Sequence, residues 1–392
     1  MKKIKSPSLR FIDLFAGIGG FHQALTKLGH KCVFASEINK FAAEVYKNNF
    51  GIDPLSDITK IHVEDIEKHD VLCAGFPCQA FSNAGHKKGF EDVRGTLFFD
   101  IKRILEHHKP KYLILENVKH LVKHDGGNTW NVIKINLESL GYVITKEPLI
   151  LSPHQFGIPQ NRPRVYILGV LREKLKEKTD FIDINIDHKK ISKKIDIYTV
   201  LDQKHIDPKY KISKYEEKVI DAWEEFRKNV NKKVYGFPVW VDEFNNENSI
   251  NHLPIWKQDY IKKIRKLYLE NKTFIDKWMI KWGVADFKLR DRKFEWQAGE
   301  SVDNCWETSI QLRQSGIRFK KPDFYPALVA MVQTPIIGRY KRRLTPKEAS
   351  LLQSYPKSFK IDSNDQRAYK QLGNSVNVKV LYFIADELLR KY

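Results

Sequence analysis

The stretch FIDLFAGIGGF, residues 11–21, decides the fold that the sequence predicts. It begins as a short apolar run of β-forming side chains and ends in a cluster of three glycines, Gly17, Gly19 and Gly20. Glycine here permits a sharp turn between a strand and a helix, and it lets a ligand approach the backbone closely. The spacing differs from GxGxxG because residue 22 is His. The turn alone therefore fits an ordinary structural turn as well as a cofactor site.

Short β-rich runs alternate with stretches of helical periodicity from Leu9 to about Val170. Strands are predicted at 9–15, 31–38, 70–76, 111–118 and 164–171, and helices at 21–28, 39–49, 98–108 and 129–140. This alternation predicts an α/β fold with a Rossmann-like, doubly wound and mostly parallel sheet. The carboxyl ends of its strands share one edge, where such sheets bind ligands.

Beyond Leu171 the sequence becomes rich in Lys and Trp, which predicts a second, smaller domain. Seven of the eight tryptophans lie between Trp223 and Trp306, and we expect most of them in a core. Near the end of the chain, Thr345 is placed to cap a helix that starts at Pro346. A final amphipathic helix is expected to follow the segment QLGNSV, residues 371–376.

The composition of the chain restricts its possible partners and its cellular compartment. Lys and Arg outnumber Asp and Glu by 68 to 48, a net charge of +20, which favours a polyanionic partner, although a general Lys bias would have the same effect. Four cysteines are too few and too scattered for a disulfide framework. No segment has the length of a membrane span or of a signal-peptide core. We expect a cytoplasmic protein that binds no membrane.

Polar side chains are expected at the ends of several strands. Glu37 follows the second strand, where an acidic residue can bind ribose hydroxyls. Asp57 is expected at another strand end and could accept a hydrogen bond from an adenine amino group while Ile58 packs on the ring. Together with the glycine turn, these positions predict a cofactor that carries adenosine. Each acidic residue taken alone could equally be a surface side chain.

The segment FPCQAFS, residues 76–82, carries the strongest chemical signal. Cys73 lies inside the predicted strand and is expected to be buried and inert, whereas Cys78 lies where the chain leaves the sheet. Glu116 ends the next strand on the same edge. A cysteine and a glutamate that face one cleft form a pair of nucleophile and acid.

Seven segments, in this order, resemble the cytosine-C5 DNA methyltransferases, especially those of bacterial restriction and modification systems. They are DLFAGIGGF, GFPCQAFS, GFEDVRGTLFFDI, ENV, QFGIPQNRPRVYILG, RRLTPKEASLLQSYP and QLGNSV, and they span nearly the whole chain. The resemblance implies a class I methyltransferase fold that uses S-adenosylmethionine. It also implies methyl transfer to C5 of a cytosine flipped out of a short, specific duplex site.

The resemblance assigns roles to individual residues. Cys78 matches the nucleophile that adds to C6, Glu116 the residue that bonds N3 and the exocyclic amine, and Arg162 and Arg164 the orienting arginines. The base that removes the C5 proton is not identified. The implied cofactor residues are Phe15, Gly17, Ile18, Gly19, Glu37, Ile38, Asp57, Ile58, Pro77, Leu97, Asn374, Ser375 and Val376. Ser56 stands where the family usually has glycine.

The resemblance also divides the chain. Residues 1–174 form the catalytic and cofactor-binding domain, 175–345 the domain that recognises the DNA target, and 346–392 a segment that returns to the catalytic domain. The segment 79–96 resembles a loop that closes over flipped DNA. Ser82, Lys88, Arg94, Arg313 and Arg318 are the predicted DNA contacts, and Lys87, Lys320 and Lys321 are further candidates.

Other functions fit the sequence less well. An RNA (tRNA) cytosine-C5 methyltransferase on the same scaffold would have a smaller target region, and a catalytically dead DNA-binding relative would not need Cys78, Glu116 and both arginines. An amino-group methyltransferase lacks its Asp/Asn-Pro-Pro-aromatic tetrapeptide here, and a nicotinamide dehydrogenase leaves Cys78 unexplained. The expected partners are double-stranded DNA and, functionally, a cognate restriction endonuclease. We expect a monomer without a metal.

Overall fold

The computed structural model describes residues 7–77, 97–186, 196–202, 206–231, 236–328 and 334–392. The chain forms two compact units, Met1–Ile195 with Ala349–Tyr392, and Asp196–Glu348. The N-terminal part of the first unit ends at Ile195, about twenty residues later than the boundary expected after residue 174. The reason is that Ile182 donates its N–H to the Ile144 carbonyl at 3.0 Å, and Asp183 donates its N–H to the Tyr392 hydroxyl at 2.8 Å. These contacts keep the segment after residue 174 with the first unit.

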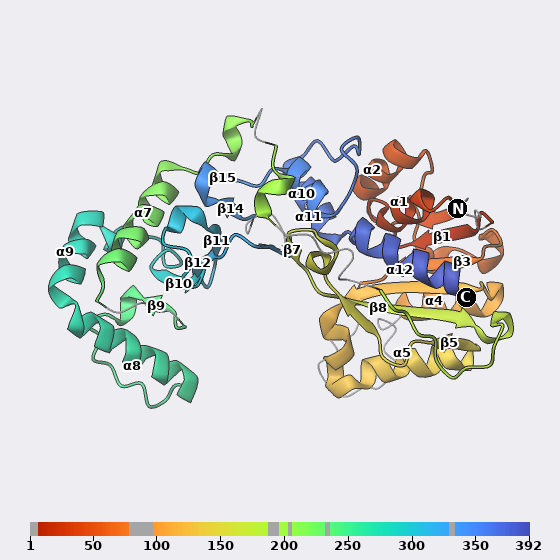
Figure 1. Cartoon of the computed structure of the whole chain (residues 1–392), viewed down its shortest axis with the longest axis horizontal. Helices are drawn as coiled ribbons and strands as arrows, with labels where there is room; N and C mark the ends of the chain where they lie inside the picture. Colours follow the sequence, from red (N-terminus) through yellow and green to blue (C-terminus); the bar gives the residue numbers. More distant parts are fainter. Residues whose placement is uncertain (1–6, 78–96, 187–195, 203–205, 232–235, 329–333) are drawn as a thin grey trace. The chain divides into compact units, whose positions relative to one another are not determined.

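A seven-stranded sheet forms the centre of the first unit (Figure 1). The strand order is β2-β1-β3-β4-β8-β5, and β6 also pairs with β8. The strands are β1 (Arg10–Leu14), β2 (Lys31–Ser36), β3 (Val71–Gly75), β4 (Tyr112–Val118), β5 (Tyr142–Ile144), β6 (Leu149–Leu151) and β8 (Arg164–Leu171). All five predicted strands are present. The first four are parallel to one another, as predicted.

The strand β8 differs from the prediction because it runs antiparallel to β4, β5 and β6. A parallel connection needs a crossover, usually a helix, whereas antiparallel strands can follow one another through short loops. Helix α5 provides such a crossover between β4 and β5, but no α-helix separates β5, β6 and β8. The chain therefore turns back along the sheet. The periodicity that finds a strand does not reveal its direction.

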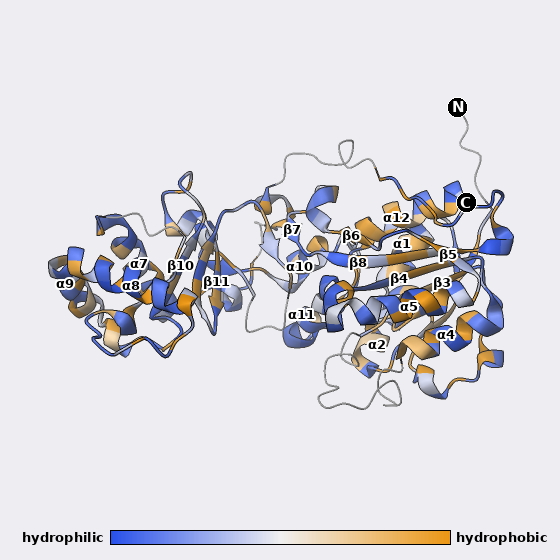
Figure 2. Ribbon diagram, turned by 90° about the horizontal axis from the view of Figure 1, so that it is seen from below, coloured by the Kyte–Doolittle hydropathy of each residue, from blue (hydrophilic) through white to orange (hydrophobic). Residues whose placement is uncertain are grey.

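Helices cover both faces of this sheet. The described helices that lie wholly or partly in the first unit are α1 (Gly20–Lys27), α2 (Lys40–Phe50), α4 (Leu97–His108), α5 (Asn128–Ser139), α10 (Pro346–Leu352), α11 (Asp365–Asn374) and α12 (Val378–Lys391). The four helices predicted before residue 140 are present within a residue or so. Figure 2 shows α1 and α12 on one side of the apolar strands and α4 and α5 on the other. Among the described residues, no helix is both long and apolar enough to cross a membrane.

The start of α10 confirms the predicted cap. The Thr345 hydroxyl accepts the Glu348 N–H at 3.2 Å, and the Glu348 carboxylate accepts the Thr345 N–H at 2.9 Å. This reciprocal arrangement is a capping box. Both side chains are buried, so the two bonds fix where the helix begins.

The second unit contains a six-stranded sheet in the order β15-β14-β11-β12-β10-β9. The strands are β9 (Val239–Trp240), β10 (Lys293–Gln297), β11 (Ser309–Arg313), β12 (Gly316–Lys320), β14 (Ile336–Ile337) and β15 (Arg342–Arg343). Among the described residues, this sheet is accompanied by α7 (Lys214–Asn229), α8 (Ile255–Glu270) and α9 (Lys272–Trp282), none of which was predicted from the sequence. A usable signal was present, because Ser213 and Glu216 form a capping box at the start of α7.

Most tryptophans of this unit pack in its core or against it, as expected. Trp223, Trp278 and Trp296 are at most 3% exposed and pack in one cluster, whereas Trp256 is 60% exposed. The Trp223 ring stacks on Phe294 of β10 with centroids 4.9 Å apart. Aromatic packing thus joins α7 to the sheet.

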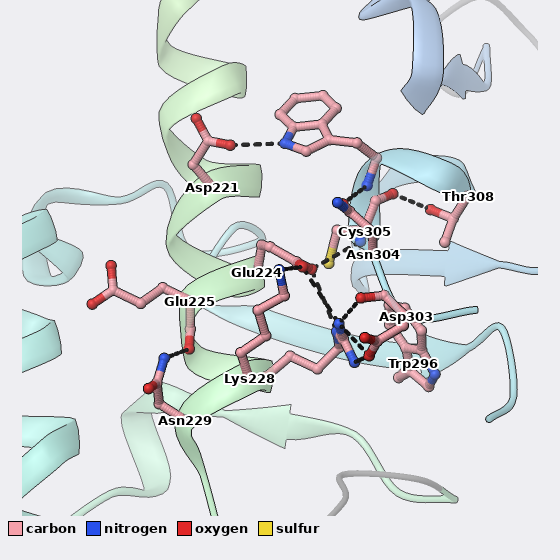
Figure 3. A network of polar contacts seen from close by, with 12 residues as sticks. Asp221, Glu224, Glu225, Lys228, Asn229, Trp296, Asp303, Asn304, Cys305 and Thr308 are labelled. Atoms are coloured by element: carbon pink, nitrogen blue, oxygen red, sulfur yellow. Dashed lines mark hydrogen bonds and ion pairs between the residues drawn. The ribbon is translucent and has the colours of Figure 1, made fainter. Parts of the chain in front are cut away.

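A polar network also joins α7 to the sheet (Figure 3). Glu224 of α7 accepts the Cys305 N–H at 2.8 Å and contacts Lys228 at 2.9 Å. Arg227 bonds the Glu224 carboxylate and lies 4.6 Å from the ring centroid of Trp296 in β10. Burial raises the pKa of the Cys305 thiol well above its usual value, so this cysteine is structural.

Asp13 of β1 generates a prediction for stability. Its side chain is completely buried, and Oδ2 accepts the His22 N–H at 3.3 Å, while Oδ1 has no partner in the described residues. Burial, with Glu37 adding repulsion, raises the pKa of Asp13 well above its usual value. A raised folded pKa contributes stability that is complete below the unfolded value of about 4 and is lost as the pH rises through the folded value.

We predict that Asp13→Asn removes this loss, because an amide stays neutral. In urea unfolding between pH 4 and pH 8, the free energy of unfolding of the variant should rise relative to that of the wild type as the pH increases. Equal slopes for the two proteins would show that Asp13 does not carry the pH dependence.

Candidate active site

The glycine turn after β1 has the geometry of a ligand-binding turn. Phe15, Gly17 and Gly19 have positive φ values of 54°, 55° and 85°. A Cβ atom at Gly17 would meet nothing within 4 Å, whereas one at Gly19 would lie 2.2 Å from Cε2 of Phe50. Gly19 is thus required by packing, and Gly17 borders open space. Ile18 between them is buried.

Glu37 holds this turn from the next strand. One carboxylate oxygen accepts the Gly17 N–H at 2.8 Å and the other accepts the Asn39 N–H at 2.7 Å. Each oxygen keeps acceptor capacity, because a carboxylate offers about four lone-pair sites. Beside it, the Ile38 side chain is 71% exposed. An exposed isoleucine next to a carboxylate at the sheet edge gives an apolar surface and an acceptor together.

No strand ends at Asp57, contrary to the expectation. Leu55 forms an isolated parallel bridge with Glu37, and Pro54 contributes a carbonyl that accepts the Glu37 N–H at 2.8 Å. Proline has no N–H to continue a ladder, so the pairing stops there. The true third strand is β3, which begins at Val71.

Asp57 instead caps a short 3₁₀ helix, Ile58–Lys60. Its carboxylate accepts from the Thr59 N–H at 3.1 Å and the Thr59 hydroxyl at 2.7 Å, and these bonds lower the pKa of Asp57. Ile58 is only 5% exposed and packs in the core of the unit. The exposed apolar side chains in this region are therefore Ile38 and Leu55 rather than Ile58.

The C-terminal segment reaches the glycine turn within the first unit. A Cβ atom on Gly20 would lie 2.4 Å from Cγ2 of Val376 and 3.2 Å from the Ser375 hydroxyl. A Cβ atom on Gly75 would lie 3.6 Å from Cγ1 of Val376 and 3.8 Å from Oε2 of Glu116. The segment after α11 thus lies against both the glycine turn and the end of β3. Asn374 is exposed.

Glu116 is buried near the end of β4, and two arginines surround it. Arg164 Nε lies 3.2 Å from Glu116 Oε1. Burial raises the pKa of Glu116, although Arg164 and Arg162 act in the opposite direction. Burial also lowers the pKa of Arg162 to about 9. A carboxyl group that keeps its proton more readily than usual can act as an acid.

Arg162 connects the site to the C-terminal segment. Its Nη2 donates to the carbonyls of Gly373 at 2.6 Å and Ser375 at 3.0 Å. Its Nε and Nη1 are buried and have no partner within the described ranges. Buried donors without partners are costly, so they suit a site that a bound group completes.

Asn117 is a site residue that the sequence analysis did not single out. It is 3% exposed, its Nδ2 donates to the Phe76 carbonyl at 2.9 Å, and its Oδ1 accepts the Val118 N–H at 2.8 Å. The amide therefore ties the end of β4 to the chain just before Pro77. The tripeptide ENV contained this residue, but only the pairing of β3 with β4 shows what it contacts.

The remaining predicted residues fall into two groups. Pro77 is exposed after β3, and Leu97 is half-buried at the start of α4. Cys78, Ser82, Lys87, Lys88 and Arg94 lie outside the described residues. No three His, Cys, Asp or Glu side chains gather as a metal site in the part of the chain that the structure describes.

The model of the C-5 cytosine-specific DNA methylase family matches residues 9–390. The chain belongs to this family. It is 32% identical to the type II methyltransferase M.AluI of Cellulosimicrobium cellulans, covering 97% of this chain and 92% of the relative. It is also 32% identical to M.HhaI of Haemophilus parahaemolyticus, covering 96% and 93%. These matches confirm the predicted family and its activity as a cytosine-C5 DNA methyltransferase.

Solved structures confirm the fold. The Dnmt2 methyltransferase of S. pombe matches 98% of this chain and 99% of its own length, with a TM-score of 0.55 and 20% identity. The Spodoptera frugiperda DNMT2 mutant matches with a TM-score of 0.57, also at 20% identity, and covers 97% and 100%. The α/β class I methyltransferase fold is thus the one predicted.

Glu116 and Arg164 give a first prediction for the site. Replacing Arg164 with Ala removes the cation nearest to the carboxylate, so the pKa of Glu116 should rise further above its ordinary value. Carbon-detected NMR titration of the glutamate carboxyl groups measures this. Arg172→Ala, just beyond the opposite end of β8, is the control and should leave the titration unchanged. A fall in the pKa of Glu116 in Arg164→Ala would contradict the ion pair.

Asn117 gives a second prediction. Asn117→Ala leaves the buried Phe76 carbonyl without its partner, which should cost about 1–3 kcal/mol in the free energy of unfolding. We expect kcat to fall by more than KM changes, because the chain before Cys78 loses its anchor. Asn136→Ala, which removes a similar bond to the Val132 carbonyl on α5, is the matched control. Equal effects of the two substitutions on kcat would assign Asn117 a purely structural role.

Proposed function

We propose that the protein transfers the methyl group of S-adenosylmethionine to C5 of a flipped cytosine in duplex DNA through a covalent bond between Cys78 and C6. The observation that carries this proposal is the position of Glu116. It is a buried carboxyl group with a raised pKa, and it lies beside Arg164 and close to the Gly75–Val376 contact at the carboxyl end of β3. Cys78 follows β3 by three residues.

The residues at the sheet edge fit an adenosine-bearing cofactor. Gly17 borders open space, Glu37 keeps acceptor capacity for ribose hydroxyls, and Ile38 exposes an apolar side chain for the base. Asp57 is an acceptor in the same region, and Ser375 and Val376 lie against the glycine turn. When bound, S-adenosylmethionine supplies an electrophilic methyl group.

The reaction follows from the chemistry of the ring. The thiolate of Cys78 adds to C6 while the protonated Glu116 donates to N3, so no full negative charge develops on the ring. The other oxygen of Glu116 can accept from the exocyclic amine. C5 would then be electron-rich enough to take the methyl group, whose bond to the sulfonium sulfur breaks and leaves a neutral thioether. Loss of the C5 proton to a base, departure of the Cys78 sulfur as thiolate and return of the N3 proton to Glu116 restore the aromatic ring and the enzyme.

Arg164 acts as a positioning residue in this scheme, and Arg162 as a residue that contacts the substrate. Arg164 fixes the Glu116 carboxyl, and the unpartnered Nε and Nη1 donors of Arg162 can bind an oxygen of the substrate. A cytosine within a duplex is stacked and cannot enter a buried site, so the base must be flipped out. Residues 79–96 are proposed to contact this DNA through Ser82, Lys88 and Arg94.

We further propose that the second unit recognises a short DNA sequence and that methylation protects it from a cognate restriction endonuclease. The relatives at 32–36% identity are type II methyltransferases, which supports this role. The net charge of +20 suits a duplex partner. The proposed enzyme acts as a monomer.

Transfer of tritium from labelled S-adenosylmethionine tests the proposal. Duplex DNA should be labelled and tRNA should not. Cys78→Ser should lower the rate by at least about a thousandfold while DNA binding persists, because the nucleophile is lost. Cys32→Ser, at a buried cysteine in β2, is the control and should stay active. Label entering only tRNA, or full activity of Cys78→Ser, would contradict the proposal.

A further inference from the structure

One face of the sheet in the second unit is polar. Side chains alternate along β10, β11 and β12, so that Phe294, Trp296, Ile310, Leu312, Ile317 and Phe319 enter the core. The alternate positions form what we call the polar face, namely Lys293, Glu295, Gln297, Ser309, Gln311, Arg313, Gly316, Arg318 and Lys320. It carries four cationic side chains and one carboxylate.

Glu295 lies between two arginines on the polar face. Its Oε2 atom accepts from Arg313 Nη2 at 2.5 Å and from Arg318 Nε at 3.0 Å. Glu295 is directly opposite Arg318 in the pairing of β10 with β12, so the register of these two strands brings the two side chains together. All three side chains are between 18% and 26% exposed. A single carboxylate thus holds two guanidinium groups against the sheet.

The bond to Glu295 uses only part of each guanidinium. Arg318 donates through Nε, and its two Nη atoms have no hydrogen-bond partner among the described residues. Those two nitrogens form the fork that matches two acceptors on one edge. Arg313 likewise has a buried Nε without a partner in the described ranges.

The neighbours of the arginines keep this arrangement fixed. Gly316 lies opposite Arg313, has φ +126°, and a Cβ atom there would be 2.7 Å from Cβ of Lys293, so no side chain fits beside Arg313. Gln311, opposite Arg318, is 7% exposed and closes the other side. Behind the sheet, Trp296 is held by Arg227 in the network of Figure 3. The polar face is therefore supported by a rigid core.

We propose that Arg318, oriented by Glu295, recognises the O6 and N7 atoms of a guanine in the major groove, and that Glu295 is a specificity-determining positioning residue. This inference rests on the proposed DNA methyltransferase function. An arginine that is free to move binds phosphates as readily as bases and reads no sequence. An arginine whose Nε is fixed offers its Nη fork in one direction, and guanine is the base with two acceptors that match it.

The Glu295 carboxylate also disfavours contact between the arginines and a DNA phosphate. A phosphate that approaches the arginines meets the negative charge of Glu295, whereas the acceptor edge of guanine carries no net charge. The cationic surplus of the polar face, with Lys293 and Lys320 beside the arginines, still favours DNA as the partner. Attraction to the backbone and selection of the base are thus assigned to different side chains.

The test measures the sequence context of methylation. Purified enzyme methylates a library of duplexes with randomised positions around cytosine. Bisulfite sequencing then reports the contexts in which cytosine is methylated and therefore resists conversion. The wild type should require guanine at one position at least. Arg318→Ala should lower the preference for that guanine by about ten- to a hundredfold, because a bidentate contact is lost. Glu295→Gln should relax the same position and increase methylation of other contexts.

Glu307→Gln is the matched control, because Glu307 pairs with Arg339 at 2.6 Å in the same unit but away from the polar face. It should leave the base preference unchanged. Thermal unfolding of each variant reports folding, and if Arg318→Ala is unfolded, Arg318→Lys carries the test, since it keeps the charge and loses the fork.

The inference is overturned if the Arg318 and Glu295 variants lower methylation of all contexts by one factor without changing the base preference. It is also overturned if Glu307→Gln relaxes the same position as Glu295→Gln. Absence of 5-methylcytosine from every context with the wild type is a different result, because it would overturn the proposed function and, with it, this inference.

Discussion

The buried contact between Glu116 and Arg164 is the interaction on which the first unit depends. Removing a carboxylate and a guanidinium from water is costly unless they pair closely, so their positions cannot drift. The antiparallel pairing of β8 with β4 brings them together, because Val118 lies opposite Arg164 and Glu116 lies two residues before it. The direction of one strand therefore places an acid beside its cation at the edge of the sheet where β3 ends.

The same edge explains why the end of the chain returns to its beginning. Arg162, two residues before Arg164, binds the carbonyls of Gly373 and Ser375, and Val376 packs against the glycine turn. Glycine at position 20 is required there because any side chain would overlap Val376. Acid, arginines and glycine turn thus form one connected structure although they are distant in sequence. This connection would allow the proposed cofactor pocket and the proposed catalytic acid to share a border.

Much of this could be predicted from the sequence because the signals are local. Short β-rich apolar runs located the strands at β1, β2, β3, β4 and β8, and the Thr345–Pro346 pair located α10. What could not be predicted depends on pairing between distant residues, such as the direction of β8 and the bond from Asn117 to Phe76. The expected strand before Asp57 fails because Pro54 cannot continue a ladder. In the second unit α7 carried a capping signal, whereas α8 and α9 begin without a side-chain cap, and the Lys-rich surfaces of these helices obscured their apolar pattern.

The central claim is that Cys78 forms a transient covalent bond with C6 of the target cytosine. The most direct measurement uses a duplex with 5-fluorocytosine at the methylated position, incubated with the enzyme and S-adenosylmethionine and then analysed by peptide mapping. Fluorine at C5 cannot leave as a proton does, so the complex should persist and the modified peptide should carry its adduct at Cys78. Turnover of the unmodified duplex without any trapped complex, or an adduct at another residue, would contradict the account.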